Sequence, residues 1–130
     1  MTIINGYFDE LEFWDSCYFG KPIIKDNKLV IPVRNLGIYE THPLNNTDEL
    51  IVLQECKLVF CDVQKSERIV YEYLGEPKSG QGFKPSYKVN DGLFMKTAEP
   101  ITTFFLEGVW EDPPAYVTWE INSVSFYLEV

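Results

Sequence analysis

A single histidine, His42, is the one side chain of this 130-residue chain suited to act as a general base near neutral pH. A serine or cysteine nucleophile needs such a base within hydrogen-bond reach. His42 lies beside Pro43 in a segment rich in asparagine, and no serine has the glycine spacing of a nucleophile elbow. We therefore interpret His42 as an exposed loop residue and expect the protein not to be an enzyme.

Paired carboxylates are the second candidate for chemistry, because two such groups can cleave a glycosidic bond. Glu111 and Asp112 are adjacent, but two prolines follow them, which is typical of a solvated turn. The acids around Asp9 lack the glycine and the loop register of a calcium site. Residues 75–82, GEPKSGQG, lack the lysine and hydroxyl residue that follow the last glycine of a phosphate-binding loop. We expect no catalytic residue and no cofactor.

The three cysteines, Cys17, Cys56 and Cys61, do not have the spacing of a metal site. A structural zinc ion needs four ligands, and the chain has no C-x-x-C pair to supply two of them. Cys56 and Cys61 are expected on one strand, where an odd separation points their side chains to opposite faces and prevents a disulfide. We expect three reduced, mostly buried thiols and no bound metal.

The acidic excess of the chain lies in its two end segments. The sequence has 20 acidic and 11 basic residues, which gives a net charge of −9. Residues 1–20 and 97–130 contain no lysine or arginine, so all the basic residues lie in 21–96. If the two ends are neighbours in the fold, they form a negative surface that attracts a basic protein. The same charge argues against nucleic acid and anionic membranes, which need clustered cations.

Aromatic residues accompany the acids in both end segments, and tryptophan and tyrosine are favoured at protein interfaces. Most aromatic side chains must fill the core of a β-domain, but Trp110 and Tyr116 flank an expected turn. We predict that the acids steer a basic partner and that nearby aromatic side chains anchor it. The predicted partner-binding residues are Asp9, Glu10, Glu12, Trp14, Asp15, Trp110, Glu111, Asp112 and Tyr116.

Short β-strands are the elements expected to position these residues. Residues 21–34 predict a hairpin, because two apolar runs flank Asp26-Asn27 and both turn residues tolerate a positive φ. Pro32 has no N–H to donate, which predicts that the second strand is at an edge or bulged. The segment that follows, 34–48, is rich in asparagine and is expected to be a loop.

Residues 50–63 form the most convincing core strand. Their apolar residues change parity between Leu53 and Cys56, which predicts a β-bulge. A polar turn is expected at 64–66, after which residues 67–74 would pair antiparallel with the core strand.

A long flexible loop is predicted for residues 75–92, which contain four glycines and two prolines. Strands are expected at 93–97, 101–110 and 116–130. In the last of these the apolar parity changes after Ile121, which predicts a second bulge or a strand that bends from one sheet to another.

The opening segment, residues 8–19, has apolar spacings that fit both a helix and a strand, and its aromatic residues favour a strand. In total, about seven short strands with regularly spaced turns predict an all-β, mainly antiparallel fold. We expect a single domain over residues 1–130, built as a sandwich or a partly open barrel with at most one short helix.

These features predict a non-catalytic acidic domain that captures or neutralises a basic protein. An example is an immunity protein that blocks a cationic bacterial toxin such as a nuclease. Two alternatives remain open: a carrier that holds a small molecule in an aromatic-lined cavity, and a self-assembling subunit that pairs through an exposed edge such as 28–34. The sequence leaves monomer and homodimer undecided. The N-terminus lacks the features of a secretory signal, so we expect a cytoplasmic location.

Overall fold

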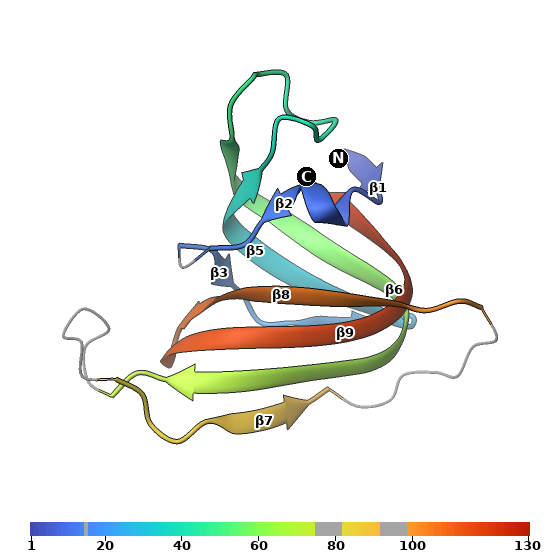
Figure 1. The fold of residues 1–130 in the computed structure, drawn as a ribbon. Helices are drawn as coiled ribbons and strands as arrows, with labels where there is room; N and C mark the ends of the chain where they lie inside the picture. The colour runs from blue at the N-terminus through green and yellow to red at the C-terminus, as the bar shows by residue number, and fades with distance from the viewer. Residues whose placement is uncertain (15, 75–81, 92–98) are drawn as a thin grey trace.

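The computed structural model describes residues 1–14, 16–74, 82–91 and 99–130. Strands dominate the chain and wrap around an apolar interior (Figure 1). The one helix in the described residues is η1, a single 3₁₀ turn at Phe8–Glu10, and none there is long and apolar enough to cross a membrane. The strands are β1 (Ile3–Asn5), β2 (Leu11–Glu12), β3 (Tyr18–Phe19), β4 (Ile23–Lys25), β5 (Lys28–Ile38), β6 (Ile51–Glu72), β7 (Tyr87–Asn90), β8 (Thr102–Glu111) and β9 (Pro114–Glu129).

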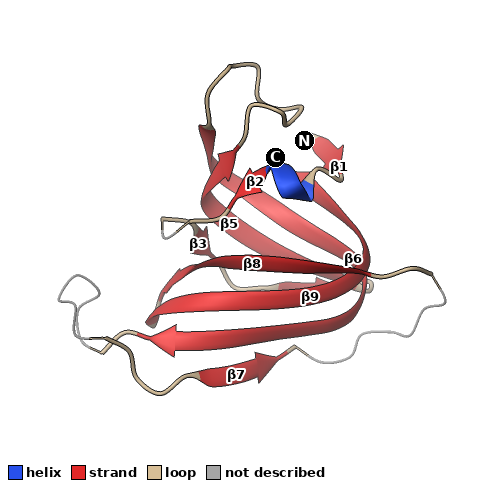
Figure 2. Cartoon of the chain, viewed as in Figure 1, coloured by secondary structure: helices blue, strands red, loops and turns tan. Residues whose placement is uncertain are grey.

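The strands form one sheet that closes on itself like a ring, with two halves facing each other (Figure 2). β6 pairs with β9 along most of its length, while its other edge pairs first with β5 and then with β7. β8 pairs with β9, and the short β3 joins β8 to β5. Among the described strands only the β3–β8 pairing is parallel. The predicted all-β, mainly antiparallel class is therefore confirmed.

The predicted hairpin at 21–34 is present as β4 and β5. Its turn residues Asp26 and Asn27 have φ values of 52° and 62°, as a tight two-residue turn requires. The prediction that Pro32 marks an edge strand was wrong, because β5 pairs with β6 on one side and with β2, β3 and β4 on the other. Pro32 is tolerated because the nitrogen and carbonyl of one strand residue face the same side, and the Pro32 carbonyl accepts a hydrogen bond from Gly20. Its missing N–H therefore faces the gap between the β4 and β3 pairings and not β6. Residues 28–34 are therefore not an exposed edge.

The expected turn at 64–66 was also wrong, because β6 runs without interruption from Ile51 to Glu72. Its second half pairs with β9 and β7, and it does not fold back on the first half. A bend takes the place of the turn: Asp62 has a φ of 53°, and the register with β9 shifts between Val63 and Lys65. At this bend β6 passes from one half of the ring to the other.

The parity changes predicted from the sequence are present, but the β-bulge predicted between Leu53 and Cys56 is not, because the β5–β6 register is the same on both sides of this point. In β6 the more buried side chains are at odd-numbered positions up to Leu53 and at even-numbered positions from Cys56 to Phe60. This change lies opposite Asn35 of β5, whose φ is 61°. In β9 the buried positions change from odd numbers, up to Ser123, to even numbers from Phe126 onward. Ser123 pairs with Val63, so β9 changes parity beside the bend of β6 and the two strands curve together (Figure 1).

The segment predicted as a flexible loop is only partly described. Residues 75–81 and 92 lie outside the described residues, as does the strand expected at 93–97. Within the loop, residues 87–90 form β7 and pair with β6, which corrects the prediction. The strands expected at 101–110 and 116–130 are present as β8 and β9.

Aromatic rings fill the interior between the two halves of the ring. Phe8 lies 4.8 Å from Phe104, and Phe60 lies 5.1 Å from Phe126, between ring centroids. The buried Cys17 and Cys56 have their thiol pKa values raised to about 12, mainly by burial, so both remain protonated at neutral pH. Together with the half-buried Cys61 they are free thiols.

Candidate functional site

The acids predicted at the two ends of the chain lie at different places in the fold. Asp9, Glu10 and Glu12 lie on η1 and β2, whereas Asp15 is outside the described residues. The C-terminal pair Glu111–Asp112 lies where β8 turns into β9.

A cation lies between these two groups of acids. Glu12 pairs with Gly37 of β5, and Glu111 forms an ion pair with Arg34 of the same strand. Gly37 and Arg34 are three residues apart, which corresponds to about 10 Å along the strand. The two predicted groups of acids therefore do not merge into one uninterrupted negative surface.

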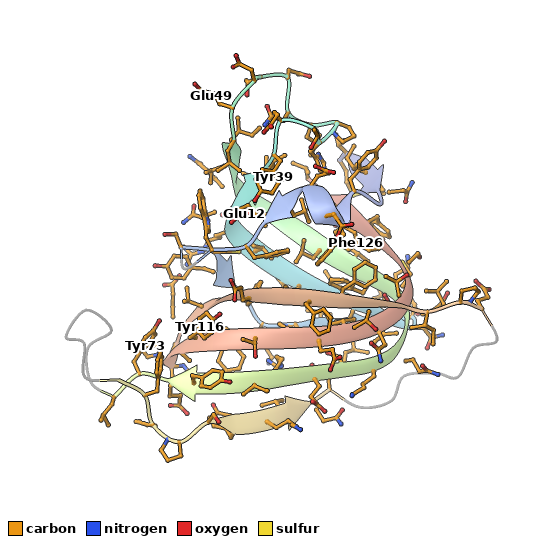
Figure 3. The ribbon with its side chains drawn as sticks, in the orientation of Figure 1. Glu12, Tyr39, Glu49, Tyr73, Tyr116 and Phe126 are labelled. Atoms are coloured by element: carbon orange, nitrogen blue, oxygen red, sulfur yellow. The ribbon has the colours of Figure 1, made fainter. Side chains whose placement is uncertain are left out.

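The N-terminal acids are joined instead by the loop between β5 and β6, residues 39–50. The backbone N–H of Tyr39 donates to the carbonyl of Glu10 at 3.0 Å, and the Thr41 hydroxyl donates to the Glu10 carboxylate. Figure 3 shows Glu12 and Tyr39 at the base of this loop and Glu49 near its outer end. Neither residues 1–14 nor residues 39–50 contain a lysine or arginine. We name this surface the acidic cap: Asp9, Glu10, Glu12, Glu40, Asp48 and Glu49.

Buried polar side chains hold the loop of the acidic cap in place. His42, expected to be exposed, is only 2% exposed, and its Nδ1 accepts a hydrogen bond from the Leu44 N–H at 3.1 Å. Burial lowers the pKa of His42, and the charge of Glu10 opposes this to a smaller extent. Asn45 is also buried, and its side-chain amide donates to the carbonyls of Ile38 and Glu49. The loop is therefore an ordered platform for its carboxylates.

An exposed aromatic side chain stands beside the acidic cap at Tyr7. Gly6 and Tyr7 both have positive φ values, 77° and 61°, and form the turn that leads into η1. A tyrosine in this conformation is strained by about 1–3 kcal/mol. Tyr7 is 52% exposed, and its ring centroid lies 5.7 Å from that of His42. Tyr7 was not among the predicted anchors, and the glycine before it was the signal in the sequence for a left-handed turn.

Two of the three predicted aromatic anchors face inward. The indole N–H of Trp14 donates to the Asn35 carbonyl at 2.8 Å, so this side chain ties the N-terminal segment to β5. Trp110 packs against the buried core, with its ring 5.2 Å from the Arg68 guanidinium. Both side chains are half-buried and are engaged within the protein.

Tyr116, the third predicted anchor, lies on the outer face of β9. Its ring is 5.9 Å from that of Tyr71, and the Phe83 ring lies 6.0 Å from Tyr71 on the other side. The Tyr116 hydroxyl donates to the Glu107 carboxylate, and its pKa is raised to about 12, mainly by burial and then by this hydrogen bond. Figure 3 shows Tyr73 and Tyr116 together at the end of the molecule away from Glu49. This aromatic surface is therefore separate from the acidic cap.

The inward-facing residues of β3, β5 and β6 also line an open groove of about 1140 Å³. Its apolar wall includes Phe19, Val33 and Cys56, and Trp110 and Arg68 lie in the same lining. The aromatic lining expected for a carrier is present, but the space is an open groove and not a closed cavity.

Arg68 is the most unusual residue of the groove, because it is charged and only 8% exposed. Its Nη2 donates to Asp91 Oδ1 at 2.7 Å, and its guanidinium lies 4.8 Å from the Trp119 ring and 5.2 Å from the Trp110 ring. Ser66 donates to the other oxygen of Asp91 at 2.7 Å. This network was not predicted from the sequence, although Arg68 shares the parity of the buried Val70 in β6.

No protein-family model, curated protein or solved structure matches the chain. Within the described ranges, no group of three or more histidine, cysteine or acidic side chains is placed to hold a metal ion. The arrangement offers two kinds of binding surface: a carboxylate-rich cap on the outside and a groove with a buried guanidinium.

Proposed function

We propose that the protein is a non-catalytic binding domain that captures or neutralises a basic protein through the acidic cap. The observation that carries this proposal is the joining of η1, β2 and the 39–50 loop. Together these segments present six carboxylates without a lysine or arginine in residues 1–14 or 39–50. Asp9, Glu40, Asp48 and Glu49 are exposed, so they can meet a partner without losing an internal ion pair.

The acidic cap would act on a basic partner through long-range electrostatic attraction. Clustered charges of one sign steer an oppositely charged protein and raise its association rate by 10-fold or more at low salt. The order of the loop reduces the entropy lost on binding, and Tyr7 offers an exposed aromatic contact at the edge of the cap. A cytoplasmic inhibitor of a cationic toxin, such as the immunity protein of a bacterial nuclease, needs only these parts. Three free thiols suit that reducing compartment.

The proposal keeps Asp9, Glu10 and Glu12 from the predicted site and adds the acids of the loop. Glu111 has less to offer, because its carboxylate is paired with Arg34. Asp112 and Tyr116 lie on another part of the molecule and are not assigned to the cap.

The test compares two variants that remove the same charge. E40Q/D48N/E49Q neutralises three exposed positions of the acidic cap, and E107Q/D112N/E120Q neutralises three carboxylates elsewhere. Tagged wild-type protein is first used to capture proteins from lysate of the source organism, with elution by rising salt and mass spectrometry of the eluate. Association rates of each captured protein are then measured for all three forms at several salt concentrations.

We expect one strongly basic protein whose association slows about 10-fold with the cap variant at low salt, with a flatter salt dependence. The control variant should change the rate much less. Equal losses in both variants, or capture that depends on Lys84 and Lys88 (tested with K84Q/K88Q), would show that the acidic cap is not the contact surface.

A further inference from the structure

We propose that the groove binds a small amphipathic carboxylate, an apolar chain of the fatty-acid class whose carboxylate accepts hydrogen bonds from Arg68. This site is separate from the acidic cap, and its existence does not depend on the proposed function.

The first observation is a hydrogen-bond donor without an acceptor. Arg68 is more than nine-tenths buried and lines the groove, yet its Nε has no hydrogen-bond partner among the described residues. Leaving a buried donor unpaired costs free energy, and the cost is greater for a charged group. A ligand oxygen that reaches Nε from the groove would remove this cost.

The second observation is the character of the wall. Phe19, Val33, Cys56 and Trp110 line the groove near Arg68 and provide apolar contact for a hydrocarbon body. The groove volume of about 1140 Å³ is slightly above the range of about 300–1,000 Å³ that is usual for small-molecule sites. A chain of about ten or more carbons is therefore within its capacity, and its polar end would meet Arg68, a buried cation of the groove lining.

The third observation is the balance of charge around the groove. Arg34 is paired with Glu111, and Lys57 lies opposite Glu129 in the β6–β9 register. Lys21 also lines the groove, and no ion pair to it occurs in the described part of the chain. Asp91 already balances Arg68, and the lining also includes the acids Glu55 and Asp112, so the Arg68 Nε donor, and not an excess of cations, would hold the added carboxylate. An ionised acceptor also forms a stronger hydrogen bond with a guanidinium than a neutral acceptor does.

Tryptophan fluorescence is a direct test, because Trp110 and Trp119 flank Arg68. The full chain is titrated with dodecanoate, dodecanol and dodecylammonium, each below the concentration at which it forms micelles. We expect a saturable change with dodecanoate and binding of the alcohol and the amine that is weaker by about 10-fold or more. An affinity for dodecanol equal to that for dodecanoate would show that the groove is a nonspecific apolar surface, and it would overturn the proposal.

Two variants test the role of Arg68 itself. R68K keeps the positive charge beside Asp91 but removes the Nε donor, and R68M/D91N removes both partners so that no charge is left buried and unpaired. K65M/E120Q is the matched control, because it removes a cation and a carboxylate from outside the groove lining.

We expect both Arg68 variants to bind dodecanoate about 10-fold more weakly or not at all, and the control to bind it like the wild type. Circular dichroism verifies that each form is folded. Unchanged affinity in R68K, or no binding by the wild type, would overturn the proposal and leave the acidic cap untouched.

Discussion

Two buried side chains, His42 and Arg68, each keep one nitrogen without a hydrogen-bond partner in the described part of the chain. Such a nitrogen costs about 1–3 kcal/mol of stability. In Arg68 this cost coincides with a groove, and in His42 it coincides with the loop that carries half of the acidic cap. Each of the two proposed binding surfaces therefore includes or lies beside a buried side chain that lowers the stability of the fold.

The buried state of His42 makes stability depend on pH. Its pKa is lowered from 6.5 in the folded protein, mainly by burial, so the unfolded chain binds more protons near pH 6. Stability should therefore be fully retained above about pH 6.5 and fall as the pH is lowered toward the folded pKa. Urea denaturation at about pH 7.5 and about pH 5.5 measures the loss, and H42Q should show a smaller one. An equal loss in H42Q would assign the effect to carboxylates.

Residue type alone did not predict which polar side chains are buried. His42 was expected to be exposed and Arg68 was not singled out, because polar residues are usually exposed. Their burial depends on partners that are distant in the sequence: Asp91 lies 23 residues after Arg68, and Tyr7, whose ring lies near that of His42, precedes it by 35 residues. The acids were visible as a charge bias, but their grouping with the 39–50 loop required the fold.

Among the elements, β3 has the largest effect for its size, since its two residues join β8 to β5 and complete the ring. This contact requires a very close approach at Gly108 of β8. A Cβ atom at this position would lie 2.8 Å from the Cys17 carbonyl oxygen and 2.8 Å from the Phe19 ring. Only glycine lets β3 lie this close.

Replacing Gly108 with alanine should therefore push β3 away from β8. We expect G108A to lower the free energy of unfolding by roughly 1–3 kcal/mol, the usual cost of overpacking. Urea denaturation measures the change, and T102A, at an exposed position of the same strand, should have little effect. A G108A protein as stable as the wild type would show that the ring does not depend on this contact.

Strand parity predicted the change of face in β6 between Leu53 and Cys56 and the bend of β9, because alternation is a local property of the sequence. It did not predict which strands pair, since that depends on residues far apart in the chain. The polar residues 64–66 fit a turn as well as a bend, and only the continuous pairing of β6 with β9 distinguishes the two. Pro32 is a similar case. Its missing N–H is evident from the sequence, but its position between two paired neighbours in the sheet is not.

At the scale of the whole molecule, the net charge of −9 is a source of self-repulsion. Salt screens exposed charges over about 10 Å at 0.1 M. We expect the melting temperature to rise by a few degrees between about 10 mM and about 300 mM sodium chloride, as about 1 kcal/mol would produce. E40Q/D48N/E49Q should melt higher than the wild type at low salt and gain less from added salt. A melting temperature that falls with salt would show that attractive ion pairs dominate.

β6 pairs with strands that lie both before and after it in the sequence, so its partners are synthesised at different times. During synthesis β5 can pair with the first half of β6 early, but β9 is made more than 40 residues later, at Pro114–Glu129. Until then one edge of the longest strand has no partner, and such edges invite association between chains. The ring leaves the finished protein few open edges, so its most vulnerable period is the interval before the last strand arrives.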